Sequence, residues 1–310
     1  MKRYRDFSGY LRETFGERVQ KIPLDAGLSC PNRDGRISRE GCIFCDALGS
    51  GTGALIRQGL SIEEQIARGR EFAQRRYGAR KFIAYFQSFS NTYGPLSRLR
   101  QLYDRALEPA GMVGLSVATR PDCVDMEVVS LLNAYRERHM VWLEIGLQSS
   151  HDETLVRINR GHDVACFERS VRMSDRVGIG VCAHVILGLP GEDRPMMLET
   201  ASYLSRLPIR GVKIHLLYVV RGTTLAELYG SGAFRCLERE EYVDLVVDFL
   251  ERLPPDVVVQ RLTGDPVRSE LIAPLWALEK GKNLKAIRER LENRDTWQGR
   301  QYKNPNGNAE

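Results

Sequence analysis

Three cysteines lie close together near the start of the chain: Cys30, Cys42 and Cys45. Two residues separate Cys42 from Cys45, so one tight turn can direct both thiols at the same ion or cluster. Eleven residues separate Cys30 from Cys42, which requires the loop between them to fold back. Thiolates gathered in this way bind zinc or an iron–sulfur cluster. A closed structural zinc site uses four protein ligands, whereas this loop supplies three.

A zinc site would therefore need a fourth ligand from elsewhere in the chain. The candidates are a histidine and the remaining cysteines, which are Cys123, Cys166, Cys182 and Cys236. The total of seven cysteines is odd, and no export signal or long apolar run precedes the loop. We therefore expect a cytoplasmic protein with reduced thiols, no disulfide framework and no membrane partner.

Length and composition indicate a globular protein with a sizeable core. A chain of 310 residues is long for one average domain but suits a single α/β barrel, and 43% of its residues are hydrophobic. The net charge of +5 arises from 45 basic and 40 acidic residues. This mild excess permits an anionic substrate or nucleic acid, but on charge alone a mixed solvated surface is the favoured interpretation.

Strand-like and helix-like segments alternate along the first two thirds of the chain. A capping box, Ser61 to Glu64, begins one of the helices. Alternation of this kind predicts parallel strands joined by right-handed crossovers. Six such units fall short of the eight of a closed barrel, so we expect an α/β fold with a partial (β/α)6 TIM-type barrel. The expected strands are 18–27, 81–87, 114–119, 141–148, 180–187 and 211–218.

The expected strands end in polar or glycine-rich segments. In barrels of this kind the carboxyl ends of the strands carry the chemistry. The convergence of these strand ends on one edge therefore predicts an active site there. The segments concerned are the cysteine loop 30–45, 87–92, 119–123, Gln148, 188–192 and 218–223.

The pattern changes after residue 224. An amphipathic helix over 240–253, a late strand over 257–265 and a charged helix around Leu284 to Leu291 follow. The simplest division is a barrel core over 1–224 and a C-terminal α/β extension over 225–310 that packs on the barrel.

Several of these strand ends contain recognisable motifs, and through them the chain resembles the radical S-adenosylmethionine (SAM) superfamily. More closely it is similar to the radical SAM core of the Elongator catalytic subunit and to small Elongator-like bacterial proteins. The usual superfamily loop has three residues between its first two cysteines, and the Elongator-like branch has a longer gap. The motifs are Leu-Asp-Ala-Gly-Leu-Ser-Cys-Pro-Asn-Arg-Asp-Gly (24–35), Ser-Asn-Thr-Tyr (90–93), Ala-Thr-Arg-Pro-Asp-Cys (118–123), Ile-Asn-Arg-Gly-His (158–162) and Arg-Leu-Thr-Gly-Asp (261–265).

The resemblance implies that Cys30, Cys42 and Cys45 hold three irons of a [4Fe–4S] cluster and that SAM chelates the fourth. An electron donor such as flavodoxin or ferredoxin would reduce the cluster. Reductive cleavage of SAM would then give methionine and a 5′-deoxyadenosyl radical that abstracts a substrate hydrogen.

The resemblance also suggests SAM contacts. Ser90 and Asn91 stand where relatives bind the methionine amino group, although the usual Gly-Gly-Glu is absent. Gln148 and Arg160 match a glutamine–arginine pair that binds SAM, and an arginine fork suits a carboxylate. His184 occupies a ribose-binding position, and Gly188 lies in the segment 186–190, which resembles one that packs along adenine.

Cys123 is a further candidate because it ends the third strand and would face the site, as a hydrogen donor, an attachment point or an extra ligand. Glu144 and Glu192 are candidate acid–base groups, but an ion pair or a helix-end carboxylate is the simpler interpretation.

We therefore expect a radical SAM enzyme. The Elongator-like character favours tRNA base modification, with a protein side chain or a small metabolite as alternative substrates. An interpretation from another class is a non-catalytic iron–sulfur or zinc module that recognises a partner.

Overall fold

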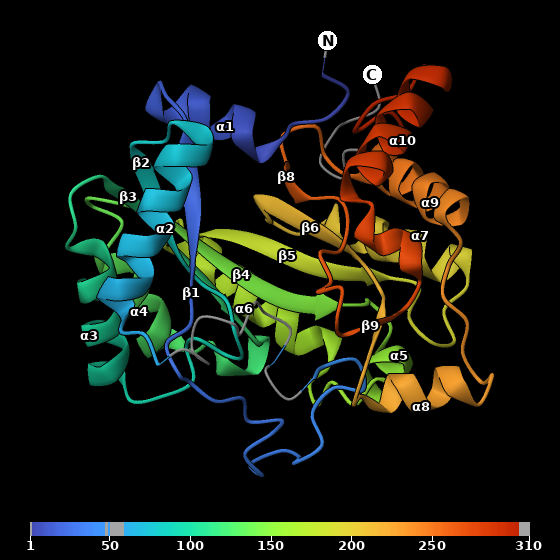
Figure 1. Ribbon diagram of the computed structural model, residues 1–310, viewed down its shortest axis with the longest axis horizontal. Coiled ribbons are helices and arrows are strands. Elements are labelled where there is room, and N and C mark those ends of the chain that lie inside the picture. Colours follow the sequence, from blue (N-terminus) through green and yellow to red (C-terminus); the bar gives the residue numbers. More distant parts are fainter. Residues whose placement is uncertain (1, 47–48, 50–58, 304–310) are drawn as a thin grey trace.

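The computed structural model describes residues 2–46, 49 and 59–303. Its central element is a sheet of seven parallel strands, hydrogen-bonded in the order β1-β2-β3-β4-β5-β6-β8. The sheet curls into part of a barrel with helices on its outer side (Figure 1). Neighbours in the sheet follow chain order because each strand returns through a crossover to the next. The strands are Val19–Leu24 (β1), Lys81–Phe86 (β2), Met112–Thr119 (β3), Met140–Gln148 (β4), Gly180–Leu187 (β5), Gly211–Leu216 (β6) and Val258–Arg261 (β8).

All six strands expected from the sequence are present, so the partial α/β barrel is confirmed. The seventh strand, β8, belongs to the late segment 257–265 that the sequence placed in the extension. It pairs in parallel with β6, where Gly211 lies opposite Val258. The sheet therefore has seven strands rather than six, and the C-terminal segment adds its last strand. The division at residue 224 remains a prediction.

Helices begin where the sequence provides capping side chains. Ser61 accepts from the backbone N–H of Glu64, whose carboxylate in turn accepts from the N–H of Ser61, as the predicted capping box requires. Asp125, Asp163 and Asp193 cap three other helices in the same way. The helices are Phe7–Phe15 (α1), Ile62–Tyr77 (α2), Leu96–Leu107 (α3), Met126–Ala134 (α4), Asp152–Arg157 (α5), Val164–Arg176 (α6), Arg194–Leu204 (α7), Thr224–Gly230 (α8), Arg239–Arg252 (α9) and Lys280–Asn293 (α10).

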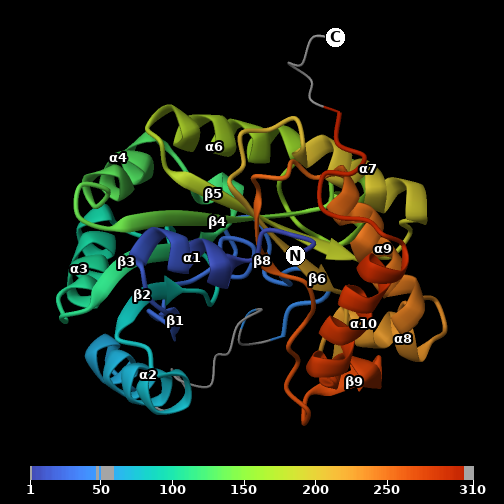
Figure 2. The same ribbon diagram turned by 90° about the horizontal axis from the view of Figure 1, so that it is seen from above.

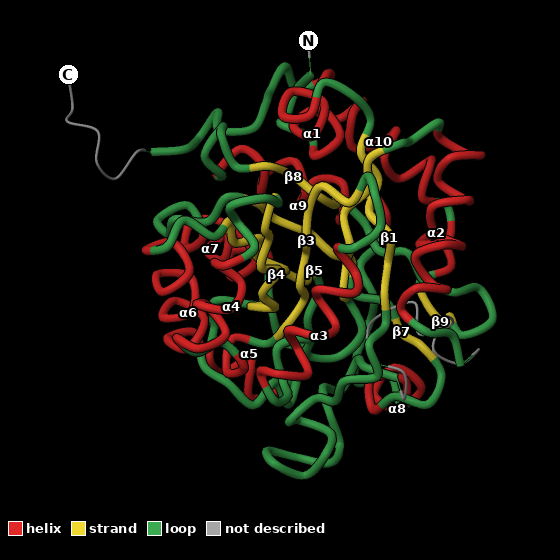
Figure 3. The backbone as a smooth tube through the Cα atoms, turned by 90° about the vertical axis from the view of Figure 1, so that its left-hand side faces the viewer, coloured by secondary structure: helices red, strands yellow, loops and turns green. Residues whose placement is uncertain are grey.

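Helix α1 covers the amino end of the barrel (Figure 2). Its Phe7 and Tyr10 pack edge-on against Trp142 of β4, with ring centroids 6.0 Å apart in both cases. The chain just before α1 also bonds to β8, where the N–H of Val259 donates to the carbonyl of Arg5. This end is therefore closed by apolar packing, which leaves the carboxyl end for polar residues. The loops that follow the strands gather at that opposite end (Figure 3).

The C-terminal segment packs on the barrel beside its last strands. Helix α9 lies against α7 and α10, and its inward side chains are fully buried, Tyr242 and Phe249 among them. A short antiparallel ribbon joins Val219–Val220 (β7) to Leu271–Ala273 (β9). Among the described residues no helix is both long and apolar enough to cross a membrane.

Candidate functional site

The loop that carries Cys30, Cys42 and Cys45 follows β1 and is anchored at its second half. The N–H of Ile43 donates to the carbonyl of Ile158 at the end of α5, 3.2 Å away. The carbonyl of Ile43 accepts from the N–H of Leu225 in α8, at 2.9 Å. Ile43 and Phe44 also pack against a small apolar cluster that includes Leu225. The chain between the second and third cysteines is thus held by the core and by the C-terminal segment together.

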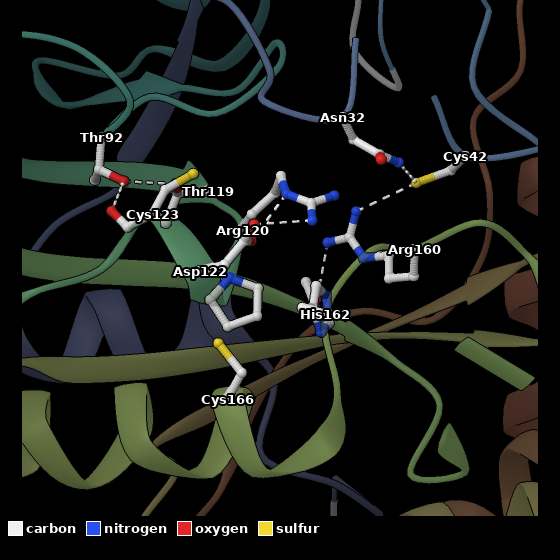
Figure 4. Close-up of polar contacts among 12 residues, drawn as sticks. Asn32, Cys42, Thr92, Thr119, Arg120, Asp122, Cys123, Arg160, His162 and Cys166 are labelled. Carbon is white, nitrogen blue, oxygen red and sulfur yellow. Dashed lines mark hydrogen bonds and ion pairs between the residues drawn. The ribbon is translucent and has the colours of Figure 1, made fainter. Parts of the chain in front are cut away.

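The Cys42 thiol is buried beside two nitrogen donors (Figure 4). Arg160 Nη1 lies 3.5 Å and Asn32 Nδ2 3.7 Å from its Sγ. A hydrogen bond from the Cys45 thiol, together with the Arg160 guanidinium, holds the pKa of Cys42 well below its usual range despite burial. The site therefore stabilises a thiolate at Cys42, which is the form that binds iron or zinc.

Gln148 and Arg160, paired by sequence, meet in the structure. Arg160 Nη2 donates to the carbonyl of Gly146 at 2.8 Å. A Cβ atom at Gly146 would lie only 2.5 Å from Arg160 Nη2 and 2.7 Å from Gln148 Nε2, so glycine is needed there. Gln148 itself has a left-handed backbone with φ of 80°, which is unfavourable for a residue with a side chain. The Gln148 and Arg160 side chains thus both lie against Gly146.

Ser90 and Asn91 lie in the segment that follows β2, next to the cysteine loop. The N–H of Ser90 donates to the carbonyl of Ser29, and Asn91 Nδ2 donates to the carbonyls of Ser88 and Ala118. The Ser90 hydroxyl and the Asn91 carbonyl oxygen are buried and make no hydrogen bond within the described chain. Both atoms are therefore available to a ligand.

Cys123 lies at the end of the short 3-10 helix Pro121–Cys123 (η2), which follows β3. Its carbonyl accepts from the Thr92 hydroxyl at 2.6 Å, and the same hydroxyl lies 2.6 Å from that of Thr119 (Figure 4). Burial raises the pKa of the Cys123 thiol to about 12. This thiol is therefore protonated at neutral pH.

Three further residues of the site had no role assigned from sequence. Arg120 forms a bidentate ion pair with Asp122, with N–O distances of 2.9 and 3.0 Å. Asn32 Nδ2 donates to the carbonyl of Asn159 at 2.6 Å, and Asn159 Nδ2 to that of Gly41 at 2.7 Å. All three residues stand within the motifs 24–35, 118–123 and 158–162, so their place in those motifs was the available signal.

His184 and Gly188 lie away from these contacts. His184 Nε2 donates to Glu144 Oε2 at 2.8 Å, inside the barrel. Gly188 has a left-handed backbone, its N–H points at the Met197 sulfur, and a Cβ there would press on Leu237. Their roles in SAM binding remain predictions.

Glu144 is part of an ion-pair network, as the simpler interpretation had it. Glu192 accepts from the Ser149 hydroxyl, and burial raises its pKa.

The residues present fit a cluster and a polar cofactor. Among the described residues no three His, Cys, Asp or Glu side chains stand close enough to hold a metal ion as placed. However, the cysteine loop is surrounded by buried polar atoms that lack a hydrogen-bond partner and that suit the amino, carboxylate and hydroxyl groups of a ligand. These atoms are Asn32 Oδ1, Ser90 Oγ, Asn91 Oδ1, Arg120 Nη1, Arg160 Nε and His162 Nε2.

Comparison with known proteins defines the class. A model of the radical SAM superfamily matches residues 33–204, and a model of the radical SAM C-terminal domain matches 209–293. The chain therefore belongs to the radical SAM superfamily, whose members use a [4Fe–4S] cluster and SAM.

Within that superfamily the chain is similar to small uncharacterised proteins and to Elongator. It is 42% identical to YtqA of Bacillus subtilis over 302 residues, which cover 96% of this chain and 92% of that protein. It is 40% identical to YhcC of Escherichia coli over 271 residues, covering 87% and 86% of the two chains. The archaeal Elp3 of Methanocaldococcus infernus shares the fold, with a TM-score of 0.69 and 16% identity. That alignment covers 90% of this chain but only 64% of the archaeal one, and it shows a shared fold. The chain is also 31% identical to Elongator complex protein 3 of Homo sapiens over 157 residues, which cover 49% of this chain and 28% of that protein, in agreement with the resemblance to the Elongator core.

Proposed function

We propose that this radical SAM enzyme binds its cluster through Cys30, Cys42 and Cys45 and binds SAM through the polar atoms that surround them. The observation that supports this assignment is the position of Arg160. One of its nitrogens contacts the Cys42 sulfur, another the carbonyl of Gly146, and the third has no hydrogen-bond partner among the described residues. A guanidinium placed in this way can join the cluster loop to a bound carboxylate.

The chemistry that the bound cluster and SAM supply is one-electron cleavage of SAM to a radical that abstracts hydrogen. The chain's own residues position these groups. Asn32 and Arg160 donate hydrogen bonds to sulfur, which stabilises negative charge on the thiolate and tunes the reduction potential. Ser90 and Asn91 would offer their free polar atoms to the methionine portion, with Gln148 beside Arg160, and His184 and Gly188 are proposed to contact the nucleoside portion. Ile43 and Phe44 would exclude water from the site, because they pack the loop against the apolar cluster that includes Leu225.

Cys123 is proposed as a hydrogen-atom donor. Its raised pKa keeps the S–H bond intact at neutral pH, as such a donor requires, and disfavours a role as a thiolate ligand. A flavodoxin or ferredoxin would supply the electron, in the reducing cytoplasm that the free thiols suit.

For the substrate we propose tRNA. The supporting observation is a pair of exposed arginines on the cysteine loop, Arg36 and Arg39, of which Arg36 has its guanidinium 5.7 Å from the centre of the Tyr93 ring. Arginine beside a partly exposed aromatic ring is a common arrangement for contacting nucleotides.

Replacement of a cluster ligand tests the cofactor assignment. Cys42→Ala, reconstituted anaerobically with iron and sulfide, is expected to lose both visible cluster absorbance and reductant-dependent 5′-deoxyadenosine. Cys166→Ala changes a thiol on α6 that is outside the loop and is expected to retain both. Turnover by Cys42→Ala would contradict the ligand assignment, and the absence of product from the unmodified protein would leave only a non-catalytic metal module.

The tRNA proposal has its own test. Deoxyadenosine release is measured with and without tRNA from a strain that lacks the gene. Faster release with tRNA is expected, and release that tRNA does not change would point to a protein or metabolite substrate instead.

A further inference from the structure

A layer of charged residues fills the barrel interior below the cysteine loop. Its centre is Glu144, whose side chain is 0% exposed. Oε1 accepts from Lys21 Nζ and from the Ser116 hydroxyl, and Oε2 accepts from Lys213 Nζ and from His184 Nε2. The carboxylate thus uses its full capacity of about four acceptor sites, so it cannot accept a further donor.

Arg261 adds another cation to this layer. The pairing of β6 with β8 is interrupted by a bulge between Val212 and Lys213, after which Lys213 lies opposite Arg261. A bulge re-aims the side chains that follow it, here turning Arg261 to the same face of the sheet as Lys213. The electrostatic effect of Arg261 reaches His215 and Tyr85, both of which belong to the interior face. The Arg261 side chain nevertheless forms no hydrogen bond or ion pair with any residue that the structure describes.

The layer therefore has more positive than negative charge. Lys21, Lys213 and Arg261 stand against the single carboxylate of Glu144, and the two histidines add no negative charge. Burial, followed by the influence of His184 and Arg261, holds the pKa of His215 well below its usual value, so its ring is neutral. Lys21 and Lys213 share the Glu144 carboxylate, whereas the partly exposed Arg261 side chain has no ion-pair partner among the described residues. The excess of positive charge at this place favours the binding of an anion.

Unused hydrogen-bonding capacity lies in the same place. His215 Nε2 is buried without a hydrogen-bond partner in the described chain. The His215 ring centre is 5.2 Å from that of His184. The side chains of His184 and Lys21 retain 15% and 16% of their surface exposed, so solvent reaches the layer although it lies inside the barrel. A ligand that enters the barrel can therefore reach these groups.

We propose that this layer binds an oxyanion of the substrate, a carboxylate or a phosphate, with Arg261 as the principal contact and Lys213 and His215 beside it. The inference rests on the radical SAM function proposed above, because it places a substrate group next to the cofactor residues. Gly146, whose carbonyl accepts from Arg160, lies opposite His184 in the sheet. The charged layer thus adjoins the expected cofactor position through this pair of residues on neighbouring strands.

The test compares the unmodified enzyme with Arg261→Gln by isothermal titration calorimetry on the reconstituted full chain. Three probes separate the sources of the oxyanion: inorganic phosphate, succinate and adenosine monophosphate. Arg268→Gln removes an exposed arginine near β8 and serves as the matched control. Arg261→Lys retains the charge without the planar fork and covers the case in which Arg261→Gln folds poorly.

At least one probe is expected to bind the unmodified enzyme and Arg268→Gln equally. Arg261→Gln should weaken this binding about tenfold or more, as expected for loss of a charge-assisted hydrogen bond, and Arg261→Lys should weaken it less. If no probe binds, or if Arg261→Gln binds as tightly as the unmodified enzyme, the inference is overturned.

Deoxyadenosine release without substrate is measured on the same samples. We expect Arg261→Gln to retain it, and its loss would assign Arg261 to the SAM site and overturn the inference. Absence of deoxyadenosine from the unmodified enzyme would instead contradict the proposed function, and calorimetry would still decide whether the oxyanion site exists.

Discussion

Replacement of Glu144 by glutamine should destabilise the protein far more than a change of one atom suggests. The amide keeps the shape of the side chain but removes the negative charge that both Lys21 and Lys213 contact. Removing one partner of a buried ion pair costs about 3–5 kcal/mol, because the remaining charge stays buried without compensation. We therefore expect the free energy of unfolding of Glu144→Gln at neutral pH to fall by about 3–5 kcal/mol.

The matched control is another buried carboxylate that has only neutral partners. Glu251 is 6% exposed and accepts hydrogen bonds from the Thr296 hydroxyl and the Gln301 amide, and it forms no ion pair within the described chain. Glu251→Gln should cost about 1 kcal/mol. Adding Lys213→Met to Glu144→Gln should restore part of the loss, since one unpaired cation is then removed.

Urea unfolding followed by circular dichroism supplies the measurement, and its pH dependence adds a second readout. Burial raises the pKa of Glu144, but Lys21 and Lys213 outweigh burial and hold it well below the ordinary value of 4.5. The stabilisation from this carboxylate is therefore complete above about pH 4.5 and is lost as the pH falls toward the lower folded-state pKa. Glu144→Gln lacks that loss, so the two stability curves should converge in acid. A neutral-pH difference below about 1 kcal/mol would refute the electrostatic argument.

Two further predictions concern the cofactor edge. Arg160→Lys should retain the cluster absorbance but raise the KM for SAM about tenfold or more, because one ammonium cannot replace three differently directed nitrogens. An unchanged KM, measured by deoxyadenosine release, would exclude Arg160 from SAM binding. Iodoacetamide at about pH 8 should label Cys123 roughly a thousandfold more slowly than an ordinary thiol, because a pKa of about 12 leaves almost no thiolate. Labelling should accelerate only as the pH rises toward that pKa, and rapid labelling of Cys123 in a peptide map at about pH 8 would contradict its assignment as a protonated thiol.

The sequence predicted local structure better than long-range contacts. The strands and the Ser61 capping box were correct because alternation and capping are properties of neighbouring residues. The place of β8 in the sheet was missed because the chain runs through α8 and α9 before it reaches that strand. Nothing in the sequence of residues 257–265 indicates that they pair with β6. Gln148 and Arg160 were paired because they match a glutamine–arginine pair of related enzymes, and the structure brings both side chains next to Gly146.

The charged layer could not be predicted from the sequence either, because it also depends on long-range contacts. Lys21, Glu144 and Lys213 stand on three strands far apart in the chain, and each alone has the appearance of a solvated side chain. The curvature of the sheet brings these three side chains together on its inner face, and this is seen only in the folded structure. The bulge that turns Arg261 inward is also invisible in sequence, because it depends on how β6 and β8 align.

The energetic cost of the layer is itself an argument for a role in binding. Barrels of this type ordinarily fill their interior with branched apolar side chains. Replacing a buried ion network by apolar residues of similar volume is often neutral, or stabilising by about 1–4 kcal/mol. The variant Lys21→Met, Glu144→Met, Lys213→Met should accordingly be at least as stable as the unmodified protein toward urea, in contrast to Glu144→Gln alone.

The same triple variant separates stability from function. If the charges serve only the fold, the variant should bind the oxyanion probes as the unmodified enzyme does. If Lys213 contacts the ligand and the other two charges keep Arg261 and His215 in place for it, the variant should remain folded yet lose that binding. A stable barrel without oxyanion binding would mean that these charges are kept for the substrate, at a cost that folding alone does not require. A variant that unfolds far more readily than the unmodified protein would show that the layer is structural.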